Sequence, residues 1–223
     1  MEAQVVSKQR VTDHGEVFTA PREVHAMLDM VKHETERIDS RFLEPACGNG
    51  NFLAEILIRK LRVVERRYRK SQLEYERNAV KAVASLYGID KLQDNVAQCR
   101  QRLFDIFDQG YTAWFKSAAK QECRDSVKLI LGRNIIHGNA LTLLTESDPP
   151  KPIVFSEWSF PFHNSFIKRC DYTFSDLLSG TAAGQTSLAF EEEYSDEGLP
   201  AFIPKVKQNF RPIPFLKLSE EYG

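Results

Sequence analysis

The sequence predicts an α/β fold in which a mostly parallel sheet is packed in three layers. Between about residues 14 and 160, short apolar runs alternate with longer segments that repeat apolar residues at helical spacing. This alternation is typical of a parallel sheet covered by helices. The first apolar run leads into a glycine-punctuated turn and a helix start, Glu44-Pro45-Ala46-Cys47-Gly48-Asn49-Gly50-Asn51. A strand, a glycine turn and a helix in this order predict a ligand site.

Composition predicts a soluble cytoplasmic protein. The 223 residues fit one domain, and 30 basic and 31 acidic residues nearly cancel, so only a local patch can favour nucleic acid. We find no apolar run as long as a membrane span and no signal segment at the N-terminus. The histidines show no ligand spacing, which predicts no metal site. The four cysteines, which are far apart and expected to be reduced, are Cys47, Cys99, Cys123 and Cys170.

The first expected elements lead up to the glycine turn. Residues 1–13 are polar and predict a flexible arm, and residues 22–38 predict one amphipathic helix. Thr19 is the expected N-cap, with Pro21 in the first helical turn, where its missing N–H costs little. The first strand is expected at Phe42-Leu43 and is short because Pro45 cannot pair within a sheet.

The glycine turn is expected to bring the backbone against a ligand. Gly48 and Gly50 have no Cβ, so the chain can adopt positive φ there. The helix that begins at about Asn51 directs free N–H groups toward the same place. Its apolar face is expected at Phe52, Leu53, Ile56 and Leu57.

Farther along this helix the composition becomes basic. Seven of the twelve residues from Arg59 to Lys70 are basic. They either face a phosphate backbone or form a solvated helix surface answered by nearby glutamates. The DNA-contacting candidates are Arg66, Arg67, Arg69 and Lys70.

The later strands carry polar residues at their ends. Asp90 closes the second expected strand, where it can accept from ribose hydroxyls or cap the helix that follows. Residues 134–141 predict a third strand and its exit turn, and residues 153–160 predict a fourth. Residues 127–130 are either a strand or a helix end.

Regular patterns weaken after Phe160. Residues 168–174 predict a hairpin arm, residues 179–186 a small-residue connector and residues 191–197 an exposed acidic run. The proline-spaced tail, residues 200–218, predicts no regular structure. We therefore expect an arm at 1–13, a domain at 14–178 and an irregular extension at 179–223, with the sheet truncated after its fourth strand.

Four of these segments together resemble a known family. Phe18-Thr19-Ala20-Pro21, the glycine turn, Gly88-Ile89-Asp90 and Gly138-Asn139-Ala140-Leu141 occur in an order similar to that of adenine-specific DNA methyltransferases. The order resembles the modification subunits of type I restriction–modification systems. This resemblance implies a Rossmann-like fold, S-adenosylmethionine as cofactor, DNA as substrate and a partner subunit for target recognition.

The resemblance also implies roles for individual residues. Thr19 and Pro21 would close over the cofactor's methionine, and the backbone of Ala46, Cys47, Gly48 and Gly50 would pass beneath it. Phe18 and Pro45 are further cofactor-binding candidates. Glu44 would hold its amino group or order the turn, and Asp90 would accept from both ribose hydroxyls. Asn139 would accept from the adenine amine. Phe52, Ile89 and Leu92 would either be apolar walls of the adenine pocket or pack in the core.

The fourth motif departs from the family pattern. Family members end the fourth strand with Asn or Asp, two prolines and an aromatic residue, which hold a flipped adenine. In this chain the end of the fourth expected strand holds Glu157-Trp158-Ser159-Phe160, so Glu157 and Phe160 are the catalytic candidates. Asp148-Pro149-Pro150-Lys151 matches three of the four letters, but it precedes the strand and is interpreted as a stiff surface loop.

Three functions remain open at this point. The first is methyl transfer from S-adenosylmethionine to the adenine amine of DNA. The second is a cofactor-binding subunit or regulator that lacks turnover. The third is a nucleic-acid-binding protein that uses the basic stretch without a cofactor.

Overall fold

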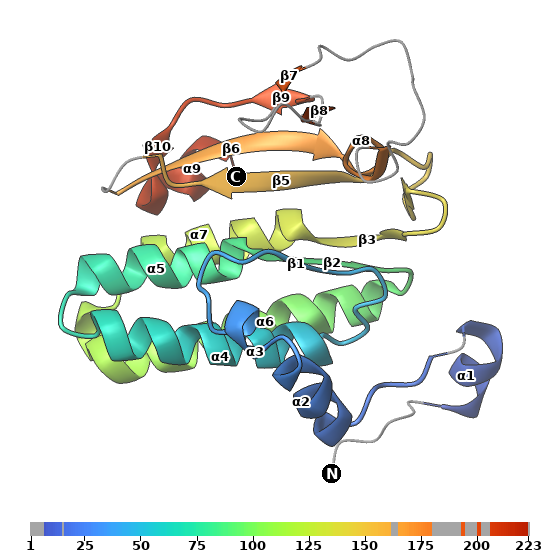
Figure 1. Ribbon diagram of the computed structural model, residues 1–223, viewed down its shortest axis with the longest axis horizontal. Helices are drawn as coiled ribbons and strands as arrows, with labels where there is room; N and C mark the ends of the chain where they lie inside the picture. The colour runs from blue at the N-terminus through green and yellow to red at the C-terminus, as the bar shows by residue number, and fades with distance from the viewer. Residues whose placement is uncertain are drawn as a thin grey trace.

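The computed structural model of the protein describes residues 7–14, 16–161, 165–179, 193–194, 200–201 and 206–222 (Figure 1). It is a mixed α/β structure with a four-stranded sheet in the order β1-β2-β3-β4. The pairings β1 with β2 and β2 with β3 are parallel, whereas β4 runs antiparallel to β3. These strands are β1 (Phe42–Glu44), β2 (Leu86–Asp90), β3 (Ile135–Asn139) and β4 (Leu144–Thr145).

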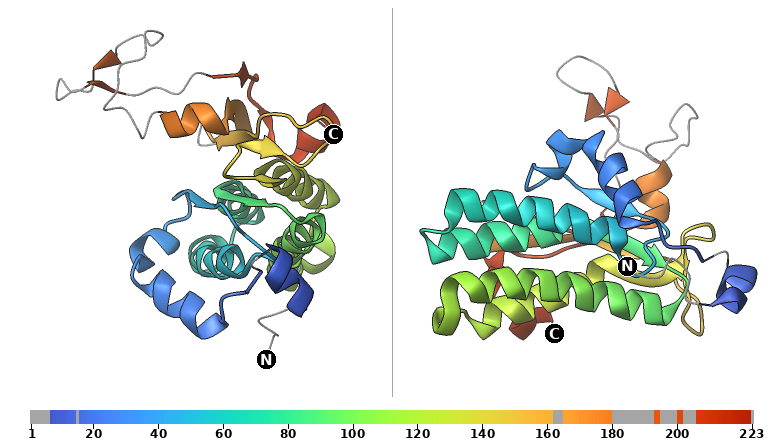
Figure 2. Two further views of the ribbon diagram at one scale, coloured as in Figure 1. Left: turned by 90° about the vertical axis from the view of Figure 1, so that its right-hand side faces the viewer. Right: turned by 90° about the horizontal axis from the view of Figure 1, so that it is seen from below.

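Each parallel crossover contains two helices. The chain passes from β1 through α4 (Asn51–Tyr68) and α5 (Gln72–Ala84) into β2. It then passes through α6 (Gln93–Phe115), the short η1 (Lys116–Ala118) and α7 (Gln121–Asn134) into β3. Figure 2 shows these four long helices running side by side. Because α5 and α7 lead directly into β2 and β3, helices and strands form one continuous layer, with α4 and α6 on one of its faces (Figure 1).

The main hydrophobic core lies between α4 and α6 on one side and the layer of α5, α7 and the parallel strands on the other. Fully buried side chains come from α4, α5, α6 and α7, among them Leu57, Val80, Leu103 and Ile130. This explains why Val127-Ile130 has an apolar pattern, since the segment lies inside α7 rather than in a strand. The glycine turn joins β1 to α4 at the edge of this core.

Residues 153–160 contain a strand as predicted, but the prediction that this strand extends the parallel sheet is wrong. It forms β5 (Val154–Ser159), which pairs antiparallel with β6 (Phe166–Thr173) in a second sheet and not with the parallel strands. The expected hairpin arm at residues 168–174 supplies most of β6. The second sheet lies over the face of the first sheet opposite α4 and α6 (Figure 1), where Phe155 packs edge-on against Tyr87 and Phe174.

Polar contacts fix β5 to the first layer. Tyr87 donates its hydroxyl to the carbonyl of Ser156 at 3.2 Å, and Trp158 donates its indole N–H to Oδ1 of Asn134 at 3.0 Å. Since Asn134 precedes β3, these contacts place the end of β5 at the amino ends of the parallel strands. A reversed β5 therefore carries its last residues away from the glycine turn.

The C-terminal tail is more regular than expected. It forms β9 (Gln208–Asn209), β10 (Ile213–Pro214), η2 (Phe215–Lys217) and α9 (Leu218–Tyr222). Phe215 and Leu218 are fully buried, and Ser126 of α7 donates its hydroxyl to the carbonyl of Phe215 at 2.6 Å. Burial of these apolar residues against α7 overrides the local effect of the prolines.

The N-terminal elements also differ from the expected single helix. Residues 21–35 form α2 (Pro21–Asp29) and α3 (Lys32–Thr35), separated at Val31, whose backbone leaves the helical region (φ −119°, ψ 33°). Pro21 begins α2 as predicted, but the N-cap position is Ala20 rather than Thr19, and no side chain caps the helix. Part of the expected arm forms α1 (Lys8–His14).

The remaining described elements are short. They are α8 (Phe174–Ser179), β7 (Glu193–Tyr194) and β8 (Pro200–Ala201). The predicted connector after Ser179 and, except for Glu193 and Tyr194, the acidic run lie outside the described residues, as do residues 1–6 of the arm. Within the described part of the chain, each helix is too short or too polar to span a membrane.

Candidate functional site

A cavity of about 570 Å³ lies at the carboxyl ends of β2 and β3. Four segments that are far apart in the sequence line it: the stretch before α2, the glycine turn, the β2–α6 junction and the turn after β3. Six of the predicted cofactor residues lie in its wall, namely Phe18, Pro45, Ala46, Gly48, Asp90 and Asn139. Leu92, expected as an apolar wall, also lines it, whereas Ile89 is fully buried in the core.

Both glycines of the turn adopt backbone conformations that other residues avoid. Gly48 has φ +51° and Gly50 has φ +87°. A Cβ at Gly48 would lie 3.0 Å from the Phe18 ring, and one at Gly50 would lie 2.7 Å from Sγ of Cys99. Gly48 therefore exposes backbone without a side chain to the cavity, whereas Gly50 allows the turn to pack closely on Cys99. The turn is anchored to β2 by the Cys47 N–H, which donates to the Ile89 carbonyl at 2.9 Å.

The Asp90 carboxylate holds three backbone and side-chain N–H groups. Its Oδ2 accepts from the Gly48 N–H at 2.9 Å, while Oδ1 accepts from the Leu92 N–H at 2.9 Å and from Nδ2 of Asn95 at 3.2 Å. The N-cap position of α6 is Leu92, so the alternative expectation that Asp90 itself caps the helix is wrong. Asp90 instead connects β2, the glycine turn and α6 at one point of the cavity wall.

Asn139 orders the turn that follows β3. Its Oδ1 accepts from the Leu141 N–H at 2.9 Å, and its carbonyl accepts from the Leu143 N–H at 2.9 Å. The residue lines the cavity with Gly138 and Ala140. One lone pair of the amide oxygen is therefore already engaged by the protein.

The other predicted cofactor residues lie behind or beside the cavity wall. Thr19 accepts through its carbonyl from Nδ2 of Asn51 at 3.0 Å, and Pro21 lines a neighbouring groove between α2, α4 and α6. Glu44 is half-buried, and burial raises the pKa of its carboxyl. Cys47 and Gly50 are buried beneath the turn, and Phe52 packs against the core.

A polar network at the cavity was not found from the sequence. Glu16 and Asn95 both line the cavity, and Nδ2 of Asn95 donates to Oε1 of Glu16 at 2.6 Å. Arg10 of α1 pairs with Glu16 through Nε at 2.5 Å and through Nη2 at 2.7 Å, and with Asp94 through Nη1 at 2.5 Å. Arg10 and Glu16 are six positions apart, but their contacts with Asp94 and Asn95 span about eighty positions, so no local sequence pattern predicts the network.

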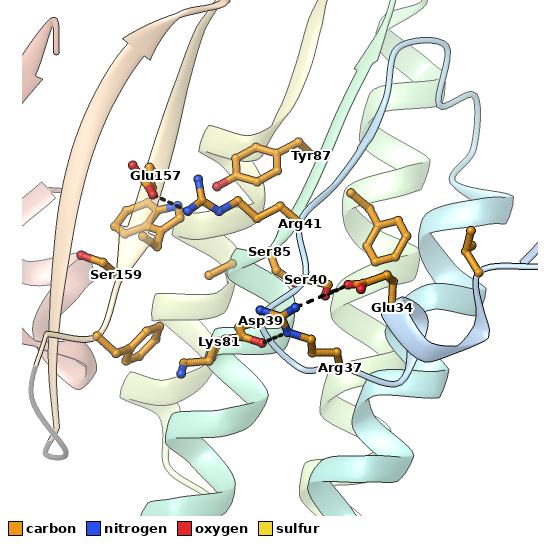
Figure 3. A pocket seen from close by; sticks show the side chains of 15 residues that line it. Glu34, Arg37, Asp39, Ser40, Arg41, Lys81, Ser85, Tyr87, Glu157 and Ser159 are labelled. Atoms are coloured by element: carbon orange, nitrogen blue, oxygen red, sulfur yellow. Dashed lines mark hydrogen bonds and ion pairs between the residues drawn. The ribbon is translucent and has the colours of Figure 1, made fainter. Parts of the chain in front are cut away.

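The two catalytic candidates lie in a different cavity, shown in Figure 3. This second cavity, of about 610 Å³, lies between the α3–β1 connection, the end of α5 and β5. Glu157 pairs there with Arg41 at 2.6 Å, and Phe160 lies near Lys81, whose Nζ is 5.5 Å from the ring centroid. Because Arg41 precedes β1, the structure does not bring Glu157 and Phe160 together with the predicted cofactor residues.

The basic stretch of α4 divides into a buried and an exposed part. Lys60 is fully buried, and Arg59 is nearly buried between Glu55 and Asp29. The predicted DNA-contacting residues Arg66, Arg67, Arg69 and Lys70 are all exposed at the C-terminal end, with Arg69 over the ring of Trp114. An 18-residue helix is about 27 Å long, so this end lies far from the glycine turn.

Comparison with known proteins bears on the part of the chain that builds the first cavity. The family model described as "MmeI, DNA-methyltransferase domain" matches residues 19–151, more than half of the chain. The match begins just before α2, includes β1 to β4 and stops before β5. No curated protein and no solved structure matches the chain. The chain therefore belongs to the MmeI DNA-methyltransferase domain family.

Proposed function

We propose that this chain binds S-adenosylmethionine in the cavity at the carboxyl ends of β2 and β3, and serves DNA methylation at the exocyclic amine of adenine. The observation that carries the proposal is the convergence of Phe18, Gly48, Asp90 and Asn139 on one cavity. Ligands of open α/β sheets bind outside the carboxyl ends of the strands. The proposal treats the first sheet as the cofactor-binding half of a Rossmann-like methyltransferase.

The residues present fit the cofactor. Gly48 lines the cavity without a side chain, and a Cβ there would lie 3.0 Å from the Phe18 ring of the same wall, so a ligand can approach the backbone at this point. The carboxylate of Asp90 suits ribose hydroxyls, and the ring of Phe18 with the side chain of Leu92 suits an apolar part of the ligand. When bound, the cofactor would supply an electrophilic methyl group. The chain's own residues would bind it, orient it and exclude water.

A cofactor-binding subunit without turnover of its own is the second candidate. The specific observation in its favour is the position of Glu157 and Phe160, which lie with Arg41 in the second cavity. The amine of a target base needs an acceptor close to the methyl donor. In this second candidate, a partner subunit of a cytoplasmic restriction–modification system supplies the base-gripping residues and target recognition.

The exposed end of α4 is our proposed contact with DNA outside the reacting base. Arg66, Arg67 and Lys70 are exposed and can approach phosphates. Their distance from the glycine turn means that they would hold a flanking part of the duplex.

Two measurements separate the candidates. Calorimetry with S-adenosylmethionine and with S-adenosylhomocysteine tests binding, and transfer of a labelled methyl group to unmethylated DNA tests turnover. Binding with transfer supports the enzyme, and binding without transfer supports the subunit. Absence of binding by folded protein would overturn both.

A further inference from the structure

Within the cofactor cavity, the sequence assigns both ribose hydroxyls to one carboxylate, that of Asp90. A carboxylate has about four lone-pair positions. Among the described residues, the N–H groups of Gly48, Leu92 and Asn95 already fill three of them on Asp90. The position that remains is on Oδ2. One position cannot serve two hydroxyl groups well.

The carboxylate of Glu16 offers another lone-pair position that can accept a hydrogen bond in the same cavity. Its Oε1 accepts from Arg10 and from Asn95, and its Oε2 accepts from Nε of Arg10. In the described part of the chain this leaves one position on Oε2. The side chain is 7% exposed and lines the same cavity as Asp90.

Asn95 sets the two carboxylates side by side. Its Nδ2 donates one hydrogen to Oε1 of Glu16 and the other to Oδ1 of Asp90, while its Oδ1 accepts from Arg10 at 3.3 Å. A flipped amide would present its oxygen to two carboxylates and its NH₂ to a guanidinium, so the network fixes the orientation. Asn95 is 2% exposed, so water does not compete for these bonds.

Arg10 keeps the second carboxylate charged. Its hydrogen bonds are the main cause that lowers the pKa of Glu16 below the ordinary value, against the opposing effect of burial. Arg10 lies in α1, before the family match begins at residue 19. Arg10 and Glu16 thus lie outside the matched region, whereas Asp90 and Asn95 lie within it.

We propose that Glu16 is a second ribose-binding residue, so that Glu16 and Asp90 each accept from one hydroxyl of the cofactor's vicinal diol, with Asn95 and Arg10 as positioning residues. The proposal rests on the proposed function, because it concerns the same cavity. It changes the expectation that Asp90 alone accepts from both hydroxyls.

The test compares S-adenosylhomocysteine with its 2′-deoxy and 3′-deoxy analogues by calorimetry. The proteins are the wild type, Glu16→Gln, Asp90→Asn and the control Glu23→Gln, which alters an exposed glutamate of α2. Glu16→Gln should weaken binding of S-adenosylhomocysteine by about tenfold or more, the effect of losing a hydrogen bond to a charged group. It should leave binding of one deoxy analogue nearly unchanged, and Asp90→Asn should do the same for the other analogue.

Several outcomes would overturn the inference. Equal weakening of all three ligands by Glu16→Gln would show a structural role, and no weakening would show no role. Wild-type protein that binds S-adenosylhomocysteine but responds only to Asp90→Asn rejects this inference and keeps the proposed function. Wild-type protein that binds none of the ligands rejects both. If Glu16→Gln does not fold, Glu16→Asp replaces it in the test. This variant keeps the negative charge but moves the acceptor oxygens away from the ligand. It must weaken binding of S-adenosylhomocysteine and leave binding of one deoxy analogue nearly unchanged.

Discussion

The backbone N–H of Gly48 donates to Oδ2 of Asp90 at 2.9 Å. This bond joins the turn after β1 to the end of β2, two parallel neighbours whose carboxyl ends meet at one edge of the sheet. The two sequence segments with the clearest ligand-binding pattern are thus in direct contact. The contact makes the shape of the turn depend on the Asp90 carboxylate.

Replacing Gly50 should destabilise the fold, whereas replacing Gly132 should not. Gly50→Ala forces a side chain into φ +87° and sets its Cβ 2.7 Å from Sγ of Cys99, at a cost of roughly 1–3 kcal/mol in the free energy of unfolding. Gly132 lies within α7, and a Cβ there would meet no heavy atom within 4 Å, so Gly132→Ala should stabilise by up to about 1 kcal/mol. Urea denaturation of both variants measures the difference. Equal effects would mean that the turn does not adopt this conformation.

Glu157 should be dispensable for cofactor binding. In the ion pair between Glu157 and Arg41, the Glu157 side chain is 27% exposed and the Arg41 side chain is 64% exposed. Because water screens such a pair, we expect a coupling free energy below about 1 kcal/mol in a double-mutant cycle of Glu157→Gln and Arg41→Gln. Calorimetry on Glu157→Gln should give the wild-type affinity for S-adenosylhomocysteine. A large loss of affinity in a variant of unchanged stability would contradict the separation of the two cavities.

Lys60 should make stability depend on pH. Its Nζ is buried and donates to the carbonyls of Ile38 and Ser40 and to the hydroxyl of Ser85, and burial lowers its pKa to about 7. The unfolded chain then binds more protons than the folded one between about pH 7 and the ordinary lysine value. The free energy of unfolding should therefore rise with pH there, by at most about 1.4 kcal/mol per pH unit.

The control for this prediction is Lys60→Met, which cannot titrate at that position. Denaturation at a series of pH values from about 6.5 to about 10, which brackets the folded and unfolded lysine pKa values, should show a steeper rise in the wild type than in the variant. Parallel curves would mean that Lys60 stays charged in the folded protein throughout this range.

The exposed end of α4 should contribute to the salt dependence of DNA binding. A triple variant with Arg66, Arg67 and Lys70 changed to alanine should reduce the slope of log affinity against log salt by up to about 0.9 for each phosphate group that these side chains neutralise. The matched control changes three other exposed basic residues to alanine, Lys207, Arg211 and Lys217. The same slope change in both variants would show only a general charge effect.

Local patterns were sufficient for the parts of the structure that connect neighbours in sequence. Apolar runs before Glu44, Asp90 and Asn139 predict β1, β2 and β3 because each is followed at once by a glycine or polar turn. Six of the residues that the family resemblance selected line one cavity. The roles of the individual residues in holding a cofactor stay predictions.

Long-range contacts account for what the sequence did not reveal. Residues 153–160 have strand character, but whether they pair with β1 or β6 depends on Phe166–Thr173 and on buried contacts such as Trp158 with Asn134. The bond between Glu16 and Asn95 spans 79 positions. The burial of Phe215 depends on α7, nearly ninety residues earlier.

The most direct test of the proposed cofactor site is calorimetric titration of S-adenosylhomocysteine into wild-type protein and into Asp90→Asn, with Asp105→Asn as a control at an exposed position of α6. We predict saturable binding at one site in the wild type and in the control, and an affinity at least about tenfold weaker in Asp90→Asn. No binding by the folded wild type, or equal binding by all three proteins, would contradict the assignment of this cavity to the cofactor.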